Sequence, residues 1–270
     1  MLGIVVLGFL LVVYFAYKTP RGDTIFLCAT YFDCPKRNSW AMFQKGINGL
    51  RGAHSQQTLS RIDRWIVINE YSPNPKDNWQ KKMAKTYPFI EFIQKTKADE
   101  GQAKSLNHLM AYLPYYTYWL HWEESWYPTR PFLDDAWAAM DQTDISQLQF
   151  TKNETGDTDW MNFSRKCDHK TAICRIYHTA VLDQAIKDYK TRQIQPTPQE
   201  VAKTWPLYSL RPSLNRVSFY KFGNFTLKPQ SYPFTSEYDF ATRWYLAGGQ
   251  KAVFSDGPVT RPPDYVSTHD

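Results

Sequence analysis

The segment 118–126, Tyr-Trp-Leu-His-Trp-Glu-Glu-Ser-Trp, constrains the fold more than any other part of this chain. Its first five residues are apolar or aromatic apart from one histidine, and Glu123 and Glu124 follow directly. A run of this length and composition is typical of a buried strand. Ligands of open α/β sheets bind outside the carboxyl ends of the strands, so the segment predicts a metal or substrate site at these two acids. Two solvated loop glutamates are the alternative interpretation.

Strand and helix patterns alternate from Thr24 onward. Apolar runs and helical periodicity predict strands at 24–30, 64–69, 89–95, 116–123, 147–150, 172–178 and 251–254, and helices at 38–50, 75–87, 102–112, 131–140, 182–189 and 238–247. The polar stretch 152–171 is expected to be a loop or insertion. This alternation predicts an α/β fold with a largely parallel sheet and helices packed on it.

Composition and missing motifs exclude several classes of protein. The net charge of +6 favours anionic partners such as phosphates or a membrane surface, but no Lys/Arg run is dense enough to predict nucleic-acid binding. The sequence has no Gly-x-Gly-x-x-Gly, no P-loop, no Gly-x-Ser-x-Gly and no His-Glu-x-x-His. A classical NAD enzyme, a P-loop NTPase, an α/β-hydrolase and the commonest zinc protease are therefore disfavoured.

The N-terminus predicts attachment to a membrane. Residues 2–17 are uncharged and almost wholly apolar, which favours an uncleaved single-pass anchor, with 1–21 as anchor and stem and 22–270 as the folded domain. Positive charge follows the segment and favours a cytosolic domain. Glycosylation sequons at Asn153, Asn162 and Asn224 favour a Golgi or ER lumen instead, so both orientations stay open.

The four cysteines fit no zinc or redox motif. Cys167 and Cys174 are close enough in sequence to form a small disulfide, and Cys28 and Cys34 could stay as thiols.

Four segments occur in an order that points to a family: Thr-Ile-Phe-Leu-Cys-Ala-Thr at 24–30, Trp-Ile-Val-Ile-Asn-Glu at 65–70, Ala-Lys-Ser-Leu-Asn at 103–107 and Trp-Leu-His-Trp-Glu-Glu-Ser-Trp at 119–126. This order resembles the nucleotide-sugar half of GT-A-type, family-2-like glycosyltransferases. The later segment 236–248 is similar to the acidic helix start, the Arg and the Gly of their acceptor half. The resemblance covers roughly 24–254. It implies a Rossmann-type, mainly parallel mixed sheet with helices on both faces.

The resemblance also implies an activity, which is transfer of a sugar from a nucleotide-sugar donor to a hydroxyl of a glycan, lipid or protein acceptor, with metal help and inversion. In such enzymes the first strand and its loop hold the nucleotide, and a later acid contacts the ribose or base. The residues at these positions and at the diphosphate or donor sugar would be Ala29, Thr30, Tyr31, Glu70, Lys104 and Asn107. A turn or helix cap is the alternative for Glu70, and a solvated helix residue is the alternative for Lys104.

Glu123 and Glu124 fall where the family places its metal-binding acids. A hard cation such as Mn²⁺ or Mg²⁺ takes oxygen ligands and offsets the charge on the leaving diphosphate. Here Ser125 replaces an expected acid, so three alternatives stay open: Glu124 substitutes for it, the Ser125 hydroxyl holds a water on the metal, or the cation is lost. His269 could complete the metal shell or belong to a frayed tail.

Glu237 aligns with the family's general base, and Asp239 is the competing candidate. A helix N-cap is the alternative for both acids. Arg243, one turn after Asp239, is expected to pair with it or to reach a phosphate. Trp126 and Trp244 are candidate platforms for sugar stacking, with burial in the core as the alternative.

Two other classes of protein are alternatives to the transferase. A catalytically inactive glycosyltransferase-like binding or scaffold protein is motivated by Ser125 in the metal motif. A carboxylate-pair glycoside hydrolase is disfavoured, because adjacent glutamates on a strand point to opposite faces, whereas hydrolysis needs two acids facing one bond.

Overall fold

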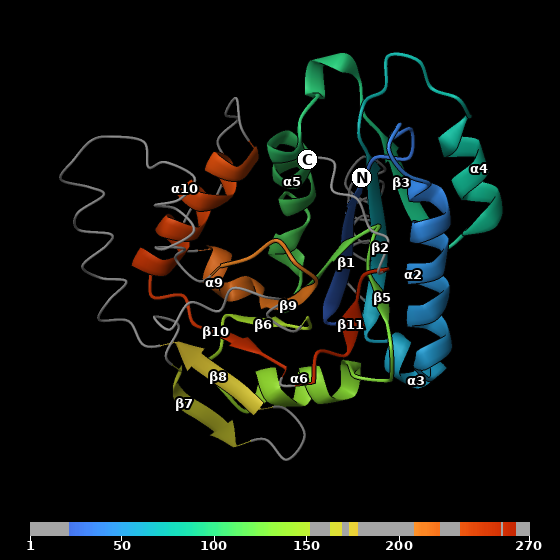
Figure 1. The fold of residues 1–270 in the computed structure, drawn as a ribbon. Coiled ribbons are helices and arrows are strands. Elements are labelled where there is room, and N and C mark those ends of the chain that lie inside the picture. Colours follow the sequence, from blue (N-terminus) through green and yellow to red (C-terminus); the bar gives the residue numbers. More distant parts are fainter. Residues whose placement is uncertain are drawn as a thin grey trace, which may run out of the picture.

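A seven-stranded sheet forms the centre of the protein (Figure 1). The computed structural model describes residues 22–151, 163–168, 173–177, 208–221, 233–254 and 256–262. The strands lie in the order β10-β6-β9-β4-β1-β2-β3. Their bounds are β1 (Thr24–Thr30), β2 (Ile62–Asn69), β3 (Ile90–Gln94), β4 (Tyr118–Glu123), β6 (Gln147–Gln149), β9 (Ser213–Arg216) and β10 (Lys251–Val253).

The sheet is mixed but mainly parallel. β1 pairs in parallel with β2 and β4, β2 with β3, and β6 with β10. Only β9 runs antiparallel, between β4 and β6. The parallel strands end at one edge, where Ala29 of β1 lies opposite Glu123 of β4. The α/β class and the mainly parallel sheet predicted from the sequence are confirmed.

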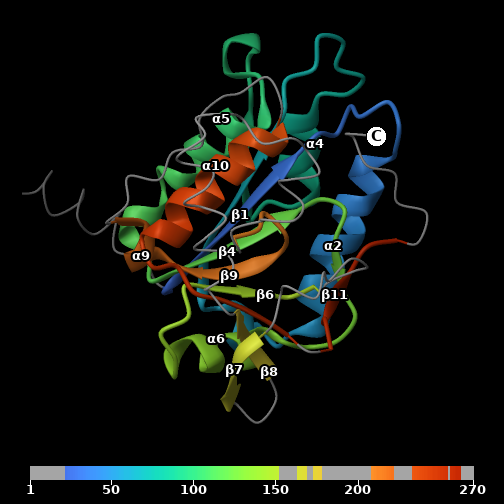
Figure 2. The same cartoon turned by 60° about the vertical axis from the view of Figure 1, so that its left-hand side comes forward.

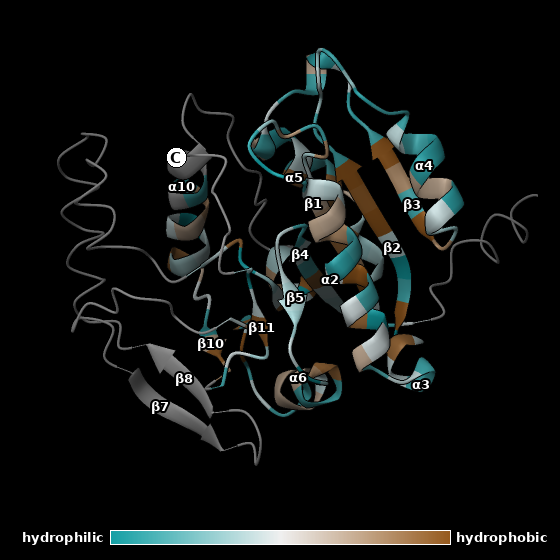
Figure 3. Ribbon diagram, turned by 45° about the vertical axis from the view of Figure 1, so that its right-hand side comes forward, coloured by the Kyte–Doolittle hydropathy of each residue, from teal (hydrophilic) through white to brown (hydrophobic). Residues whose placement is uncertain are grey.

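One face of the sheet is covered by α2 (Ser39–Ala53), α4 (Trp79–Thr86) and α6 (Leu133–Asp141). The side chain of Asn38 accepts a hydrogen bond from the Ala41 backbone at 3.0 Å and caps α2. Phe26 and Val67 of the sheet pack in one apolar cluster with Phe43 of α2. Figure 3 shows the apolar β2 and β3 behind these amphipathic helices.

The opposite face is covered by α5 (Gln102–Met110), α9 (Val217–Lys221) and α10 (Pro233–Leu246). Leu27 and Ile66, one position along from the residues facing α2, pack with Leu106 of α5 and Trp244 of α10. Figure 2 shows α5 and α10 side by side on this face. Helices therefore lie on both faces of the sheet.

Short elements complete the description. They are α3 (Gln56–Leu59), the 3-10 turns η1 (Lys97–Asp99) and η2 (Leu113–Tyr115), the antiparallel pair of β5 (Tyr127–Pro128) and β11 (Val259–Thr260), and the hairpin of β7 (Phe163–Asp168) and β8 (Ile173–Tyr177).

Three sequence predictions were wrong in detail. The stretch 152–171, expected to be a loop, contains β7. The helix expected at 75–87 begins only at Trp79, because the side chain of Asn78 accepts from the Lys81 backbone and caps it there. The helix expected at 238–247 begins at Pro233, so Glu237 and Asp239 lie inside α10 and neither is its N-cap.

Several predictions lie outside the described residues. These are the membrane anchor and stem at 1–21, the three sequons, the helix at 182–189 and His269. Within the described ranges, no helix combines the length and apolar character needed to cross a bilayer. The membrane attachment and its orientation stay predictions.

Candidate functional site

The carboxyl edge of the parallel strands brings together most of the predicted site residues. Thr30 at the end of β1 lies opposite Asn69 at the end of β2, and Ala29 lies between Ile68 and Glu123. Thr30 is buried, whereas Ala29 and Tyr31 are partly exposed. The main chain after β1 therefore reaches the surface between the ends of β2 and β4, as expected for the loop that holds the nucleotide.

Asn69 holds the residues that follow β1 in place, a role that the sequence interpretation missed. Its Oδ1 accepts hydrogen bonds from the Phe32 backbone at 2.9 Å and from the Thr30 hydroxyl at 3.2 Å. Its Nδ2 donates to Oε1 of Gln94 at 2.9 Å, at the end of β3. One buried amide thus links the ends of three strands. The signal in the sequence was the position of Asn69, a polar residue at the end of the apolar run of β2.

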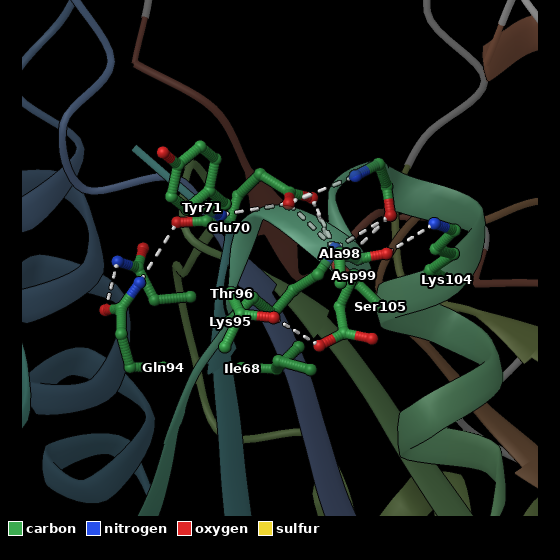
Figure 4. A network of polar contacts seen from close by, with 12 residues as sticks. Ile68, Glu70, Tyr71, Gln94, Lys95, Thr96, Ala98, Asp99, Lys104 and Ser105 are labelled. Carbon is green, nitrogen blue, oxygen red and sulfur yellow. Dashed lines mark hydrogen bonds and ion pairs between the residues drawn. The ribbon is translucent and has the colours of Figure 1, made fainter. Parts of the chain in front are cut away.

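Glu70 lies at the centre of a polar network (Figure 4). Its carboxylate pairs with the ammonium of Lys95, at 2.7 Å to Oε1, and accepts from the backbone of Tyr71 and Gly101 at 3.0 and 3.1 Å. The Ser105 hydroxyl donates to Oε2 at 3.2 Å. The carboxylate therefore holds the start of α5 against the end of β2, which leaves little of its hydrogen-bonding capacity for a ribose or base.

Lys95 supplies the positive charge of this network, and the sequence interpretation missed it. Its side chain is only 2% exposed, and its ammonium also donates to the Ser105 hydroxyl at 2.7 Å and to the Gly101 carbonyl at 2.9 Å. Burial lowers the pKa of Lys95, and the hydrogen bond and charge of Glu70 oppose that shift. The signal in the sequence was a lysine directly after the alternating apolar residues of β3.

Lys104 and Asn107 lie three residues apart on α5. Lys104 is exposed, and its ammonium donates to the carbonyl of Ala98 in η1 at 2.7 Å (Figure 4). Asn107 is partly buried. Both lie on the helix that Glu70 and Lys95 anchor, so any contact they make with a donor depends on that network.

Glu124 is buried and paired with an arginine. Its carboxylate accepts from the guanidinium of Arg37, just before α2, and both side chains are 7% exposed. Burial raises the pKa of Glu124, and the positive charge of Arg37 opposes that shift. Ser125, beside it, is also buried. Nothing in the sequence near Arg37 signalled this pair, because 87 residues separate the partners.

Glu123 contacts a different arginine. Its Oε2 accepts from the Trp126 indole N–H at 2.9 Å and lies 3.4 Å from Nη2 of Arg261. The Arg261 guanidinium in turn lies 4.1 Å from the centre of the Trp126 ring. Trp126 is 1% exposed. Its indole therefore packs in the core and against Arg261, which is the alternative interpretation, and sugar stacking by Trp126 stays a prediction. Trp244 is likewise fully buried.

The two glutamates do not fit a divalent cation in this arrangement. Each carboxylate already has a guanidinium partner, so the charge that would attract a cation is balanced. Among the described residues, no three His, Cys, Asp or Glu side chains are grouped to hold a metal. A role for Mn²⁺ or Mg²⁺ stays a prediction from the resemblance, and no step proposed below uses one.

Glu237 is an acid whose environment raises its pKa. It lies on α10 and its Oε1 accepts a hydrogen bond from the Leu210 backbone at 2.9 Å. Burial raises the pKa of Glu237 to about 7, the Leu210 N–H opposes the shift, and the charge of Glu123 adds to it. A carboxylate with a pKa near neutrality can take and release a proton under ordinary conditions.

Asp239 has a different environment. Its Oδ2 accepts from Nε of Arg243 at 3.1 Å, one turn later on α10. Both side chains are about one quarter exposed, at 25% and 28%. The predicted pairing of Asp239 with Arg243 is confirmed. The Asp239 carboxylate is already held by a guanidinium, whereas Oε1 of Glu237 accepts from a backbone N–H, so the geometry favours Glu237 of the two candidates.

Comparison with solved structures identifies the fold. The crystal structure of S. aureus TarS 1-349 matches with a TM-score of 0.54 and 15% identity, over 87% of this chain and 58% of that chain. TarS is a GT-A-type glycosyltransferase. This chain has a GT-A fold. The resemblance stated from the sequence is thereby confirmed at the level of the fold.

Further TarS structures extend this GT-A match. TarS 1-349 in complex with UDP-GlcNAc matches with a TM-score of 0.56 and 15% identity, over 91% of this chain and 62% of that chain. The complex with UDP matches with a TM-score of 0.54 and 16% identity, over 87% and 58%. This chain thus spans less than two thirds of these TarS chains. No family model and no curated protein matches the sequence significantly.

Proposed function

We propose that this chain transfers a sugar from a nucleotide-sugar donor to an acceptor hydroxyl. The observation that carries the proposal is Glu237, a carboxylate with a pKa of about 7 on the helix that covers one face of a GT-A sheet. Its pKa responds to the charge of Glu123, so the base candidate lies within electrostatic reach of the strand end where a donor would bind.

The reaction that fits this arrangement is a single displacement. Glu237 accepts the proton of the acceptor hydroxyl as its oxygen attacks the anomeric carbon. The new glycosidic C–O bond forms while the bond from the anomeric carbon to the phosphate oxygen breaks. The nucleoside diphosphate leaves with that electron pair, and the configuration at the anomeric carbon inverts.

The donor would bind at the carboxyl edge of β1, β2 and β4. In this proposal the main chain at Ala29, Thr30 and Tyr31 contacts the nucleotide, with Asn69 holding that turn in place. Lys104 and Asn107 extend toward the diphosphate or the sugar, and Glu70 positions their helix. TarS structures contain UDP and UDP-GlcNAc, so UDP-sugars are the first donor class to test.

A second candidate is a binding protein that has this fold but no transferase activity. The observation that favours it is that both acids of the metal motif are already paired with arginines. Such a protein would bind a nucleotide sugar without consuming it.

The test is release of the nucleotide from a panel of UDP-, GDP- and CMP-sugars with mixed glycan, lipid and peptide acceptors. The transferase account expects turnover with one donor class, and a loss of roughly 10²–10⁴-fold in Glu237→Gln. Asp239→Asn, on the same helix, is the matched control and should keep activity within a few-fold. Donor binding without release in any mixture would establish the binding protein instead.

A further inference from the structure

We propose that Arg261, in place of a divalent cation, supplies the positive charge that holds the donor diphosphate beside Glu123. The inference rests on the proposed function, because its ligand is the nucleoside diphosphate part of the donor. The family resemblance places a metal between the acids after β4 and the leaving group. In this chain the guanidinium of Arg261, which follows β11, lies 3.4 Å from Oε2 of Glu123.

Backbone pairing fixes the place of Arg261. Thr260 of β11 pairs with Tyr127 of β5, the residue directly after Trp126. Arg261 therefore leaves β11 next to the turn that carries Glu123 and Trp126. Its guanidinium lies 4.1 Å from the Trp126 ring centre and 3.4 Å from Oε2 of Glu123, and its side chain is 28% exposed.

The charges at this edge leave no excess negative charge to attract a cation. Arg37 and Glu124 form a buried pair and balance each other, as do Arg261 and Glu123 nearer the surface. A divalent cation approaching this cluster would meet no net negative charge. A diphosphate would compete with the Glu123 carboxylate, whose Oε2 lies 3.4 Å from Nη2 of Arg261, for a guanidinium that can bind phosphate oxygens in a bidentate manner.

This arrangement makes opposite predictions for Glu123. If Arg261 holds the diphosphate, Glu123→Gln removes the carboxylate that competes for it, and binding becomes tighter or stays unchanged. Glutamine keeps an oxygen that can accept from the Trp126 indole, so the turn is preserved. If Glu123 instead holds a metal, the same substitution removes a ligand and weakens metal-dependent binding.

The experiment is calorimetric titration of the full 270-residue chain with UDP, GDP and inorganic pyrophosphate, each in EDTA and in Mn²⁺. The variants are Arg261→Gln, Arg261→Lys and Glu123→Gln. Arg64→Gln is the matched control, because Arg64 also pairs with a glutamate, the exposed Glu91, but on β2 and the edge strand β3. The thermal midpoint of each variant without ligand shows whether it is folded.

The proposal expects binding of at least one diphosphate in EDTA, changed less than about threefold by Mn²⁺. It expects a loss of roughly tenfold or more in Arg261→Gln, a smaller loss in Arg261→Lys, and no loss in Glu123→Gln or Arg64→Gln. Binding that requires Mn²⁺, or that a folded Arg261→Gln protein retains, would overturn the inference and leave the proposed function standing. No binding of any probe in either buffer would overturn both.

Discussion

Oε1 of Glu237 lies 2.9 Å from the backbone nitrogen of Leu210 and accepts its hydrogen bond, which joins α10 to the segment leading into β9. This contact fixes one carboxylate oxygen of the proposed base. The other oxygen is the one that a substrate hydroxyl would use. The arrangement leads to predictions for both activity and stability.

The activity of the protein should depend on the ionisation of Glu237. Because the base must be deprotonated and its pKa is raised to about 7, kcat/KM should rise as the pH passes through about 7 and level off above it. The measurement is a pH profile of nucleotide release from pH 5 to 9. A profile that is flat between pH 5 and 8 would show that another group, or none, takes the proton.

Stability should change in the opposite direction with pH. The folded protein binds the Glu237 proton more tightly than the unfolded chain, whose glutamate has a pKa near 4.5, so this group destabilises the fold progressively as the pH rises from about 4.5 to 7. Glu237→Gln removes that effect and keeps an acceptor for Leu210. The variant should therefore gain stability relative to wild type at pH 8 but not at pH 4.5. Urea unfolding at both pH values tests this, and an equal difference at the two would contradict it.

The Glu70–Lys95 pair should be needed for folding. Lys95→Met leaves the Glu70 carboxylate without its ammonium partner, and a loss of about 3–5 kcal/mol is typical when one member of a buried pair is removed. Lys82→Met is the matched control, since Lys82 pairs with Asp77 at the exposed surface and should cost less than about 1 kcal/mol. Equal losses in the two variants by urea denaturation would argue against a structural role for the network.

Two glycines of α2 should respond in opposite ways to alanine. A Cβ on Gly46 would lie 2.5 Å from the backbone oxygen of Trp126, so Gly46→Ala must displace the turn after β4 and should cost about 1–3 kcal/mol. Gly52 has open space at the same position, and Gly52→Ala should gain up to about 1 kcal/mol from helix propensity. Thermal unfolding of both variants checks this, and a tolerated Gly46→Ala would mean that the turn is not tightly packed against α2.

Cys167 and Cys174 should form a disulfide when the protein is exposed to an oxidant. They are directly opposite each other in the antiparallel β7–β8 hairpin, and facing residues in such a pair lie close enough for an S–S bond. Alkylation before and after reduction, followed by peptide mass spectrometry, would show the bond. Recovery of both as separately alkylated thiols from oxidised protein would rule it out.

The sequence predicted β1, β2 and β4 well because each of these strands has a strong apolar run. β1 was predicted with its observed bounds, and the start of the helix expected at 38–50 lies within one residue of the start of α2 at Ser39. β9 was missed because Ser213–Arg216 has one apolar residue, and its burial depends on pairing with β4 and β6. The start of α10 at Pro233 was missed because its first turn has no acid, and the acids Glu237 and Asp239 were interpreted as the start of the helix.

The candidate site was only partly predictable for a related reason. Residues at strand ends, such as Glu123 and Glu70, can be found from the periodicity that precedes them. Their partners come from distant parts of the chain, and Arg261 lies 138 residues from Glu123. No local pattern identifies such a partner. Only the three-dimensional structure therefore shows that Glu123 is paired with an arginine.

The most direct test of the account is a crystal structure of the full chain with the nucleoside diphosphate that binds best, grown in EDTA. The account predicts the nucleotide at the ends of β1 and β2, with its diphosphate contacting Arg261 next to Glu123. The account would be contradicted by a fully occupied nucleotide bound away from this edge of the sheet, with no room for an acceptor beside Glu237.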